Sequence, residues 1–449
     1  MTFPGKDIFI EDKEAQAESL RLYNEILEYL KKIISGTEFE NHVFTVGGCE
    51  RDRILERTIK DIDLVVDIPN GGILFAKWLQ ERGLTKFDVV TYEHYGTAMF
   101  TLMAFPGIEI EAVQTRKECY RDIETRNPET AFGTIIEDCE RRDFTINAIY
   151  RNISTGKVID YTGRSLRDLE NKLIVSCGDP DIIFNEDPLR ILRAVRFNFK
   201  YDDFRIDDNT YSGMLRNMHR LSIVSQERIT DEFTKMIRSD FAFEAFEMLK
   251  AIGALQYIFP FQNDEKVENF YLKFLIVDNT INKMPRDCDV RLSRIFIHLL
   301  DTEIEGLMRN MKYSNHIIKG VLWYVNHADW SVFEEDYGLR KFLYETRGNN
   351  SRLYNSMEIF KAMGYDTSLV KTRIRNNFKF FTYNLPINGN NILETLGISD
   401  GPIIGMILEE LLSEAFKNPD ISKFDCLIAS HKIYHRLITD GTIFAKEKK

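Results

Sequence analysis

The sequence predicts an α+β fold, in which an N-terminal part of mixed strands and helices precedes a long all-helical remainder. Three observations support this prediction. Short β-branched runs are concentrated between about residues 42 and 160, helical pieces lie between some of them, and strand signals nearly vanish after about residue 164. With 449 residues, the chain is long for one core and short for four full-sized domains.

The expected elements follow one another in a simple order. Residues 14–34 place Leu, Ile and Tyr at helical spacing, and GILFAKWLQERG (72–83) predicts a second helix. Six runs predict strands, namely HVFTVGG (42–48), IDLVVDI (62–68), FDVVTY (87–92), GTAMFTLMAF (96–105), IEIEAV (108–113) and GKVIDY (156–161).

The composition argues against several classes of protein. Six scattered cysteines without a C-x-x-C pair argue against a zinc ribbon and a disulfide framework. The sequence contains no run of about 18 apolar residues, so we predict no membrane span. The N-terminus is too polar for a signal peptide, so we expect a cytoplasmic protein without a membrane partner. The net charge of −11 argues weakly against nucleic acid, but residues 186–238 are locally rich in Arg and Lys.

A glycine pair and two aspartates give the first functional hypothesis. Gly47-Gly48 ends an apolar run and precedes CERDRILE, which is typical of a helix start, so backbone N–H groups there can approach a triphosphate. Asp61 and Asp63 open the next strand and share one face of it. Two like charges side by side repel, and Mg²⁺ relieves that repulsion. The pattern favours nucleotidyl transfer over two solvated aspartates on an edge strand.

A third carboxylate would help to hold two metal ions. IEIEAVQTR predicts a strand on which Glu109 and Glu111 share a face. The pattern by itself leaves open which of the two glutamates completes the site.

A helix in the basic region offers candidates for base recognition. Pro188 suits a first helical turn, with Asp187 at its positive N-terminal end. Arg190 follows Asp187 by three positions, so both can reach one ligand, and Arg193 and Arg196 extend a basic stripe. The alternative is an amphipathic helix with a capping ion pair.

Five segments occur in a characteristic order, namely GGCERD…DID, RRDFTINA (141–148), DYTGRSLRDL (160–169), EDPLRILRAVRF (186–197) and SQERITDE (225–232). Together they resemble the class II tRNA nucleotidyltransferases, or CCA-adding enzymes, and the related bacterial poly(A) polymerases of the DNA polymerase β superfamily. The resemblance implies a polymerase-β-like nucleotidyltransferase head with a mixed sheet at 1–162, a helical neck with a base-reading helix at 163–238, a helical body at 239–330 and a helical tRNA-binding tail at 331–449.

The resemblance also implies roles for individual residues. The metal-binding catalytic carboxylates are Asp61, Asp63 and Glu111, and the cofactor is Mg²⁺. Glu111 is assigned in place of Glu109 because it lies five residues before Arg116. The nucleotide-binding positions are Gly47, Gly48, Arg51, Arg142, Asp143, Asn147, Asp187, Arg190, Arg193 and Arg196. The implied partners are CTP, ATP and the 3′ acceptor end of tRNA, and the implied activity is template-independent addition of CCA with release of pyrophosphate.

The implied pair of Asp187 and Arg190 offers a physical account of base choice. Cytosine and adenine both present an exocyclic amino donor beside a ring-nitrogen acceptor, which a carboxylate and a guanidinium can complement. Guanine and uracil present the reverse order, which would set acceptor against acceptor.

Four alternatives remain. Bacterial poly(A) polymerases usually carry a G-[RK]-[RK]-F segment that 83–102 lacks, and HYGT (94–97) looks more like the CCA-adding side. CC-only enzymes tend to have a shortened loop before RRDFT, whereas 116–138 is full length. An RNA-binding protein with an inactive head is disfavoured by the three carboxylates, and an HD-type phosphohydrolase by the separation of His298 from Asp301.

Overall fold

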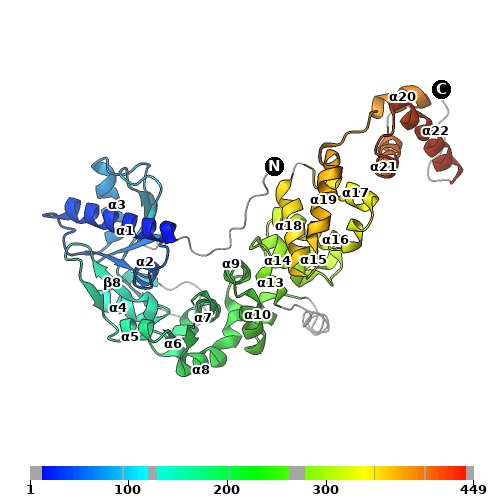
Figure 1. The fold of residues 1–449 in the computed structure, drawn as a ribbon. Coiled ribbons are helices and arrows are strands. Elements are labelled where there is room, and N and C mark those ends of the chain that lie inside the picture. The colour runs from blue at the N-terminus through cyan, green and yellow to red at the C-terminus, as the bar shows by residue number, and fades with distance from the viewer. Residues whose placement is uncertain are drawn as a thin grey trace. The chain divides into compact units, whose positions relative to one another are not determined.

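The computed structural model describes residues 13–93, 96–119, 129–201, 203–261, 279–347, 349–398 and 401–440. The chain divides into two compact units, Met1–Phe261 and Gln262–Lys449 (Figure 1). The expected head and neck both fall within the first unit. The finer division into head, neck, body and tail stays a prediction.

The first unit is built around a mixed seven-stranded sheet. Its strands, β1 (Val43–Val46), β2 (Ile62–Val66), β3 (Val90–Tyr92), β4 (Thr97–Thr101), β5 (Glu109–Gln114), β8 (Ile149–Asn152) and β9 (Val158–Asp160), lie in the order β3-β4-β5-β2-β1-β8-β9. β2 and β5 pair in parallel, and all other neighbours pair antiparallel. A separate antiparallel pair joins β6 (Arg116–Cys119) to β7 (Glu129–Phe132).

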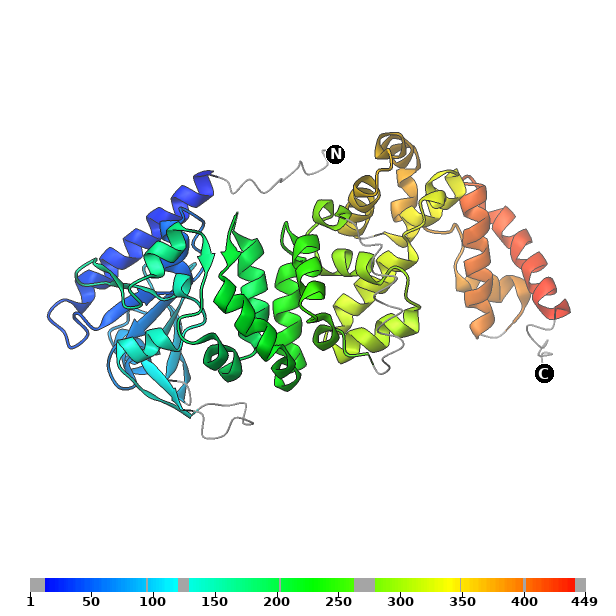
Figure 2. The same cartoon turned by 90° about the horizontal axis from the view of Figure 1, so that it is seen from below.

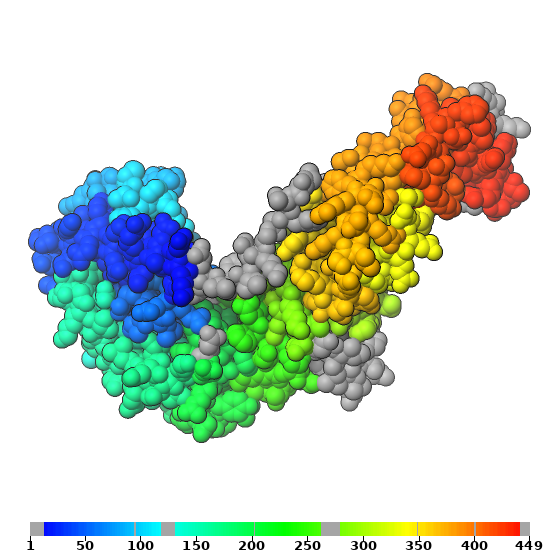
Figure 3. All heavy atoms as spheres, viewed as in Figure 1, coloured from blue at the N-terminus to red at the C-terminus, as the bar shows by residue number. Residues whose placement is uncertain are grey.

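One face of this sheet packs on two helices, α1 (Lys13–Ile34) and α3 (Gly71–Glu81), and Figure 2 shows α1 in dark blue lying against the strands. The strand residues on this face alternate with those on the other face, as the period of two requires. The buried residues of α1 are Tyr23, Ile26, Leu27, Leu30 and Ile34, while its other side is exposed at the surface (Figure 3). Burying each such aliphatic side chain stabilises the fold by about 1.5–3 kcal/mol.

The opposite face of the sheet is covered over only part of its area. Phe44, Val65 and Tyr150 pack there against Cys139 of the short helix α4 (Ile135–Glu140). The amino ends of β2 and β5 lie outside this apolar cluster. This part of the face carries the acidic side chains of the predicted site.

The remainder of the first unit is nearly all helical. Its elements are α2 (Gly48–Ile54), η2 (Thr145–Asn147), α5 (Ser165–Glu170), β10 (Leu173–Ile174), α6 (Pro180–Glu186), α7 (Leu189–Lys200), β11 (Arg205–Ile206), α8 (Asp208–Asn217), η3 (Met218–Ile223), α9 (Gln226–Ile237), α10 (Ala242–Ala251) and α11 (Leu255–Ile258). The parallel pair of β10 and β11 interrupts the expected all-helical neck. Two-residue strands show no periodicity, so their pairing comes from the packing of α5 and α7 around them.

The second unit contains only helices among its described residues. They are α13 (Thr280–Lys283), α14 (Cys288–Phe296), α15 (Asp301–Asn310), α16 (Asn315–Asn326), η4 (Trp330–Phe333), α17 (Asp336–Glu345), α18 (Asn350–Ala362), α19 (Thr367–Asn377), η5 (Phe378–Thr382), α20 (Gly389–Leu396), α21 (Pro402–Lys417) and α22 (Lys423–Thr439). An aromatic cluster around Phe333, Phe342 and Phe360 forms one core, and α20, α21 and α22 enclose another. Within the described ranges, none of the helices combines the length and the apolar character that a membrane span requires.

The predicted fold class is confirmed. Each of the six predicted strand runs contains a strand, and helices form at 14–34 and 72–83 and also after Gly48 and Pro188, as predicted. The strands β6, β7 and β8, like β10 and β11, lie outside the predicted runs. The run IYRN of β8 is too short and too polar to stand out, although its neighbours β1 and β9 bury it.

Candidate active site

The glycine pair forms the predicted turn between β1 and α2. Gly47 has φ 79°, a left-handed conformation that favours glycine, and α2 begins at Gly48. A Cβ atom on Gly47 would lie 3.6 Å from Asp63 Oδ2 and 3.8 Å from Arg142 Nη1. The turn therefore brings the backbone next to one predicted metal ligand and one predicted nucleotide ligand.

The parallel register of β2 and β5 brings two predicted carboxylates together. Asp63 and Glu111 are direct Cα partners across the two strands. Asp61 precedes β2 and is exposed, and Glu109 is exposed on the same face of β5 as Glu111. The pairing across the strands thus places Glu111, and not Glu109, opposite Asp63.

Neighbouring carboxylates raise the proton affinity of Asp63. Burial raises the pKa of Asp63 to about 6, and the charges of Glu111 and Asp61 add to the effect, against the opposing guanidinium of Arg142. Glu111 is exposed on β5, and partial desolvation and the charge of Glu109 raise its pKa, while the charge of Arg116 lowers it. At Asp63 the charges of the neighbouring carboxylates therefore add to the cost of burial in opposing ionisation.

The donor chemistry fits a divalent cation that also binds substrate. Among the residues that the structure describes, no group of three or more His, Cys, Asp and Glu side chains is gathered closely enough to hold a metal ion alone. Mg²⁺ is usually held by one or two carboxylates plus waters and substrate phosphates, which matches the paired Asp63 and Glu111. The pKa of Asp63 is raised first by burial and then by the charges of Glu111 and Asp61, and a bound cation would favour its ionised form.

Arg142 is fixed rigidly beside the carboxylates. Its Nη2 and Nε donate to Asp138 Oδ2 at 3.0 and 3.2 Å, and Nε also donates to the Tyr150 hydroxyl at 2.9 Å. Asp138 is fully buried at the end of α4 and receives a second guanidinium from Arg141 at 2.5 Å. Burial opposes ionisation of Asp138, but the charges of Arg142 and Arg141 outweigh it and hold its pKa far below the usual range.

A second set of contacts links α2 to the neck. Arg51 donates from Nε and Nη2 to Asp52 at 2.9 Å each, and from Nη1 to the Asn147 side chain. Asn147 donates to Asp143 Oδ1 at 3.0 Å, and Arg193 of α7 donates to Asp143 Oδ2 at 2.6 and 2.9 Å. Four predicted nucleotide ligands therefore form one hydrogen-bonded chain.

This chain continues into α9. Arg196 donates to Glu232 Oε2 at 2.6 Å, and Arg193 Nη1 lies 3.9 Å from Glu232 Oε1. Glu232 is almost fully buried. We call Arg51, Asn147, Asp143, Arg193, Glu232 and Arg196 the neck network.

The predicted base-reading residues, Asp187 and Arg190, contact other groups and not each other. Arg190 is buried, and it donates to the backbone carbonyls of Arg141 at 2.7 Å and Ile183 at 3.0 Å. Asp187 accepts from Arg228 Nη2 at 2.9 Å. The capping ion pair between Asp187 and Arg190 does not form, because each side chain has another partner.

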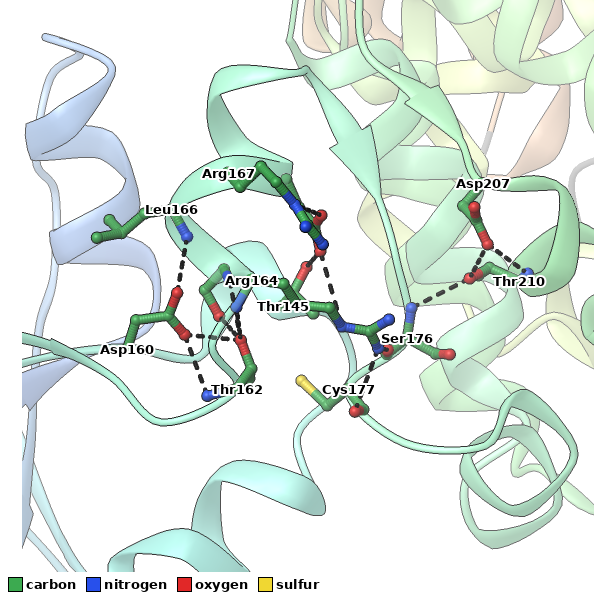
Figure 4. A network of polar contacts seen from close by, with 12 residues as sticks. Thr145, Asp160, Thr162, Arg164, Leu166, Arg167, Ser176, Cys177, Asp207 and Thr210 are labelled. Carbon is green, nitrogen blue, oxygen red and sulfur yellow. Dashed lines mark hydrogen bonds and ion pairs between the residues drawn. The ribbon is translucent and has the colours of Figure 1, made fainter.

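The segment DYTGRSLRDL belongs to a network of polar contacts that includes Thr145 and Ser176 (Figure 4). The Thr145 hydroxyl of η2 donates to Asp168 Oδ2 at 2.9 Å. Arg164 donates to the Ser176 carbonyl at 2.6 Å, and the Ser176 N–H donates to the Thr210 hydroxyl of α8 at 3.1 Å, as Figure 4 shows. These contacts hold η2, and with it Asn147, against the first elements of the neck.

The sequence analysis gave no role to several residues that build this site. They are Asp52, Asp138, Tyr150, Arg228 and Glu232. Three of them lie in recognised segments, Asp52 in GGCERD and Arg228 and Glu232 in SQERITDE, and these segments were the available signal. Parts of two other segments used above, 94–95 of HYGT and 120–128 of the loop before RRDFT, lie outside the described residues.

Comparison with known proteins adds independent information. Residues 43–175 match the family described as the poly A polymerase head domain, and 203–266 match one described as a probable RNA and SrmB-binding site of polymerase A. A CCA-adding enzyme of Ligilactobacillus salivarius is 29% identical over 417 residues, covering 91% of this chain and 96% of the relative. A tRNA nucleotidyltransferase of Schizosaccharomyces pombe is 31% identical over 327 residues, covering 69% of this chain and 62% of the relative.

A solved structure shares the fold. The crystal structure of the CCA-adding enzyme of Bacillus stearothermophilus in complex with CTP has a TM-score of 0.71 to this chain at 20% sequence identity. The likeness covers 94% of this chain and 98% of that one.

Proposed function

We propose that this chain, which belongs to the family of class II tRNA nucleotidyltransferases and poly(A) polymerases, adds CCA to the 3′ end of tRNA without a nucleic acid template. One observation carries the chemistry: Asp63 and Glu111 are register partners beside the Gly47 turn and Arg142. The relatives named CCA-adding enzyme, which match over most of this chain, support the choice of tRNA, CTP and ATP as substrates.

We assign the catalytic carboxylates to Asp61, Asp63 and Glu111, with Mg²⁺ as the ion that they hold. When bound, such an ion polarises phosphate oxygens and favours ionisation of the attacking hydroxyl. In the reaction, the 3′-oxygen of tRNA forms a bond to the α-phosphorus of the incoming nucleotide, the bond to pyrophosphate breaks, and the hydroxyl proton passes to solvent. Calorimetric titration of Mg²⁺ onto the chain and onto Asp63→Asn tests the metal role without an activity readout.

We assign the triphosphate to the turn at Gly47 and Gly48 and to Arg142 and Arg51. Arg142 is oriented by Asp138 and Tyr150, so little side-chain entropy is lost when it binds phosphate. Arg51 is buried and donates a hydrogen bond to Asp52, which orients its guanidinium group in the same way.

We assign base recognition to Asp187 and Arg190, with Asp143, Asn147, Arg193 and Arg196 as the scaffold that positions the nucleotide. The two carbonyl contacts of Arg190 fix its guanidinium, which supports a role in a rigid base pocket. Asp187 is only partly buried, and its partner Arg228 is half exposed, so the carboxylate can exchange this partner for a base amino group.

We infer that the helical part of the chain grips the acceptor arm of tRNA through shape and phosphate contacts. The match of 203–266 to a probable RNA-binding region supports this inference. We also expect the protein to act in the cytoplasm, which the scattered cysteines support.

The deciding experiment incubates a tRNA that lacks its 3′ CCA with CTP and ATP, singly and together, and measures product length on a gel. CCA addition gives two nucleotides with CTP alone and three with both. Addition of two nucleotides under both conditions would identify a CC-only enzyme. A long ladder with ATP alone would identify a poly(A) polymerase.

A further inference from the structure

The sheet face that carries the catalytic carboxylates continues in register to an apolar edge. Glu111 pairs with Asp63 on one side and with Met99 of β4 on the other. Met99 pairs in turn with Val90 of the edge strand β3. These four side chains form one cross-strand row, because direct partners point to the same face of a sheet.

The outer part of this row is apolar and open. Val90 is 52% exposed, and Tyr92, two residues along the same face of β3, is 46% exposed. We call Val90, Tyr92 and Met99 the apolar shelf. Edge strands usually carry charged residues that prevent pairing with other chains, yet the edge strand β3 contains no charged residue, and neither does β4 beside it. Exposed apolar side chains that line a functional site mark a contact surface.

The charges around the carboxylates are distributed unevenly. On the β1 side lie the Gly47 turn and the guanidinium groups of Arg142 and Arg51, all near Asp63, while Arg116, two residues after the end of β5, is the cation that acts on Glu111. The β4 and β3 side offers the apolar shelf. A triphosphate carries several negative charges, so its binding side is the side with the arginines.

The geometry of phosphoryl transfer then determines the direction from which the attacking hydroxyl approaches. The attacking and leaving oxygens lie roughly in line across the reacting phosphorus. Since the leaving pyrophosphate lies toward the arginines, the attacking hydroxyl approaches from the opposite direction. That direction leads along the row from Glu111 to Met99 and Val90.

We propose that the apolar shelf receives the 3′-terminal nucleoside of the RNA primer, with its base against Tyr92 and its sugar near Met99. This inference rests on the proposed function. Apolar and aromatic surfaces bind bases without regard to sequence, since every base has a flat π-face. Such tolerance suits a primer whose terminal base changes after each addition.

A substrate and mutant cycle tests the shelf. The substrates are a tRNA that lacks CCA and the same tRNA with an abasic 3′-terminal nucleotide. The variants are Tyr92→Ala and Val90→Thr, the latter nearly isosteric and compatible with a strand. The control is Leu74→Ala, because Leu74 is 47% exposed on α3, on the opposite face of the sheet. Circular dichroism verifies folding, and kcat/KM for tRNA and KM for CTP are measured.

For the unmodified chain we expect the abasic end to reduce kcat/KM by about tenfold, the size of one lost stacking contact. Tyr92→Ala should lose a similar factor on the normal primer and almost nothing further on the abasic one. Val90→Thr should lose less, and Leu74→Ala nothing. KM for CTP should change less than about twofold in all variants, because the shelf lies away from the triphosphate side.

Three outcomes would contradict the proposal in separable ways. An equal abasic penalty in Tyr92→Ala and the unmodified chain would show that Tyr92 does not contact the base. Self-association at β3, detected by light scattering and lost in Tyr92→Ala with kcat/KM unchanged, would assign the shelf to a second copy of this chain. Absence of any extension by the unmodified chain would overturn the proposed function itself.

Discussion

Two groups of charged side chains within the first unit differ in their partners, because one group pairs carboxylates with guanidinium groups and the other places carboxylates side by side. In the neck network and around Asp138, every carboxylate has a guanidinium partner, and charge pairing holds the pKa of Asp138 and Asp143 well below the usual range despite burial. On the sheet face, Asp63 and Glu111 have each other as register partners, and their pKa values are raised. The first arrangement stabilises the fold, and the second leaves charge for a ligand to neutralise.

The difference distinguishes two uses of charged side chains. A paired network is rigid, and its removal is costly because the remaining partner stays buried without compensation. Two adjacent carboxylates lower the stability of the fold in the absence of a cation, and the fold becomes more stable when a cation binds between them. Asp187 is intermediate, since its partner Arg228 is half exposed and can be replaced.

The largest expected effect is on activity at the sheet face. Asp63→Asn should reduce CCA addition by at least about 10³-fold, as removal of a group that acts directly on the reacting atoms does. Its thermal unfolding temperature should stay equal or rise, since the ionised side chain is disfavoured in the folded chain. Glu111→Gln should behave alike, and Glu109→Gln is the matched control. Equal losses for Glu109→Gln and Glu111→Gln would remove the distinction between the two glutamates.

The next effect is on stability and concerns Asp138. Asp138→Asn leaves the buried guanidinium groups of Arg141 and Arg142 unpaired and should lower the free energy of unfolding by about 3–5 kcal/mol. Because pairing depresses the pKa of Asp138, its contribution is complete above the unfolded pKa near 4 and is lost as pH falls below it. Denaturant unfolding at pH 7 and pH 3.5 should show a smaller difference at the lower pH.

Glu140→Gln, an exposed change at the end of the same helix, serves as the control for Asp138→Asn. It should be nearly neutral. A comparable loss in Glu140→Gln would mean that the charge of α4, and not the buried pairing, is responsible.

The third effect is on selectivity. Asp187→Ala should lower kcat/KM for CTP and ATP relative to UTP and GTP by about 10- to 100-fold, the equivalent of a lost charge-assisted hydrogen bond of about 1.5–3 kcal/mol. Arg228→Ala removes the partner and keeps the carboxylate, so its nucleotide preference should be unchanged. A uniform drop for all four triphosphates in Asp187→Ala would defeat the base-reading assignment.

The smallest expected effect is the pH dependence of the stabilisation by Mg²⁺. The pKa of Asp63 is raised from 3.8 to about 6, so the metal-free chain loses stability as pH rises across this window, and a bound cation restores it. Mg²⁺ at ten times its dissociation constant should add about 1.4 kcal/mol at pH 8, a shift of a few degrees in unfolding temperature, and much less at pH 5. Thermal unfolding with MgCl₂ or a chelator measures this shift. The same shift at both pH values, or in Asp63→Asn, would place the cation elsewhere.

The sequence determined the local parts of this protein. The Gly47-Gly48 pair and the apolar runs around it predicted a strand, a turn and a helix start, and all three form, because these features depend on residues close in the chain. Alternation placed Glu109 and Glu111 on one face of β5, which the structure confirms. The order of the recognised segments identified the family, because each preserves a local arrangement that its residues alone encode.

The tertiary structure decided which local parts meet. The β2–β5 register set Asp63 against Glu111, the packing of α7 on η2 joined Arg193 to Asp143, and α9 gave Asp187 the partner Arg228 in place of Arg190. A periodic pattern states which face of an element is apolar, but it carries no record of which distant element covers that face. Pairing over 40 to 50 positions depends on strand register and helix packing, which only the assembled core fixes.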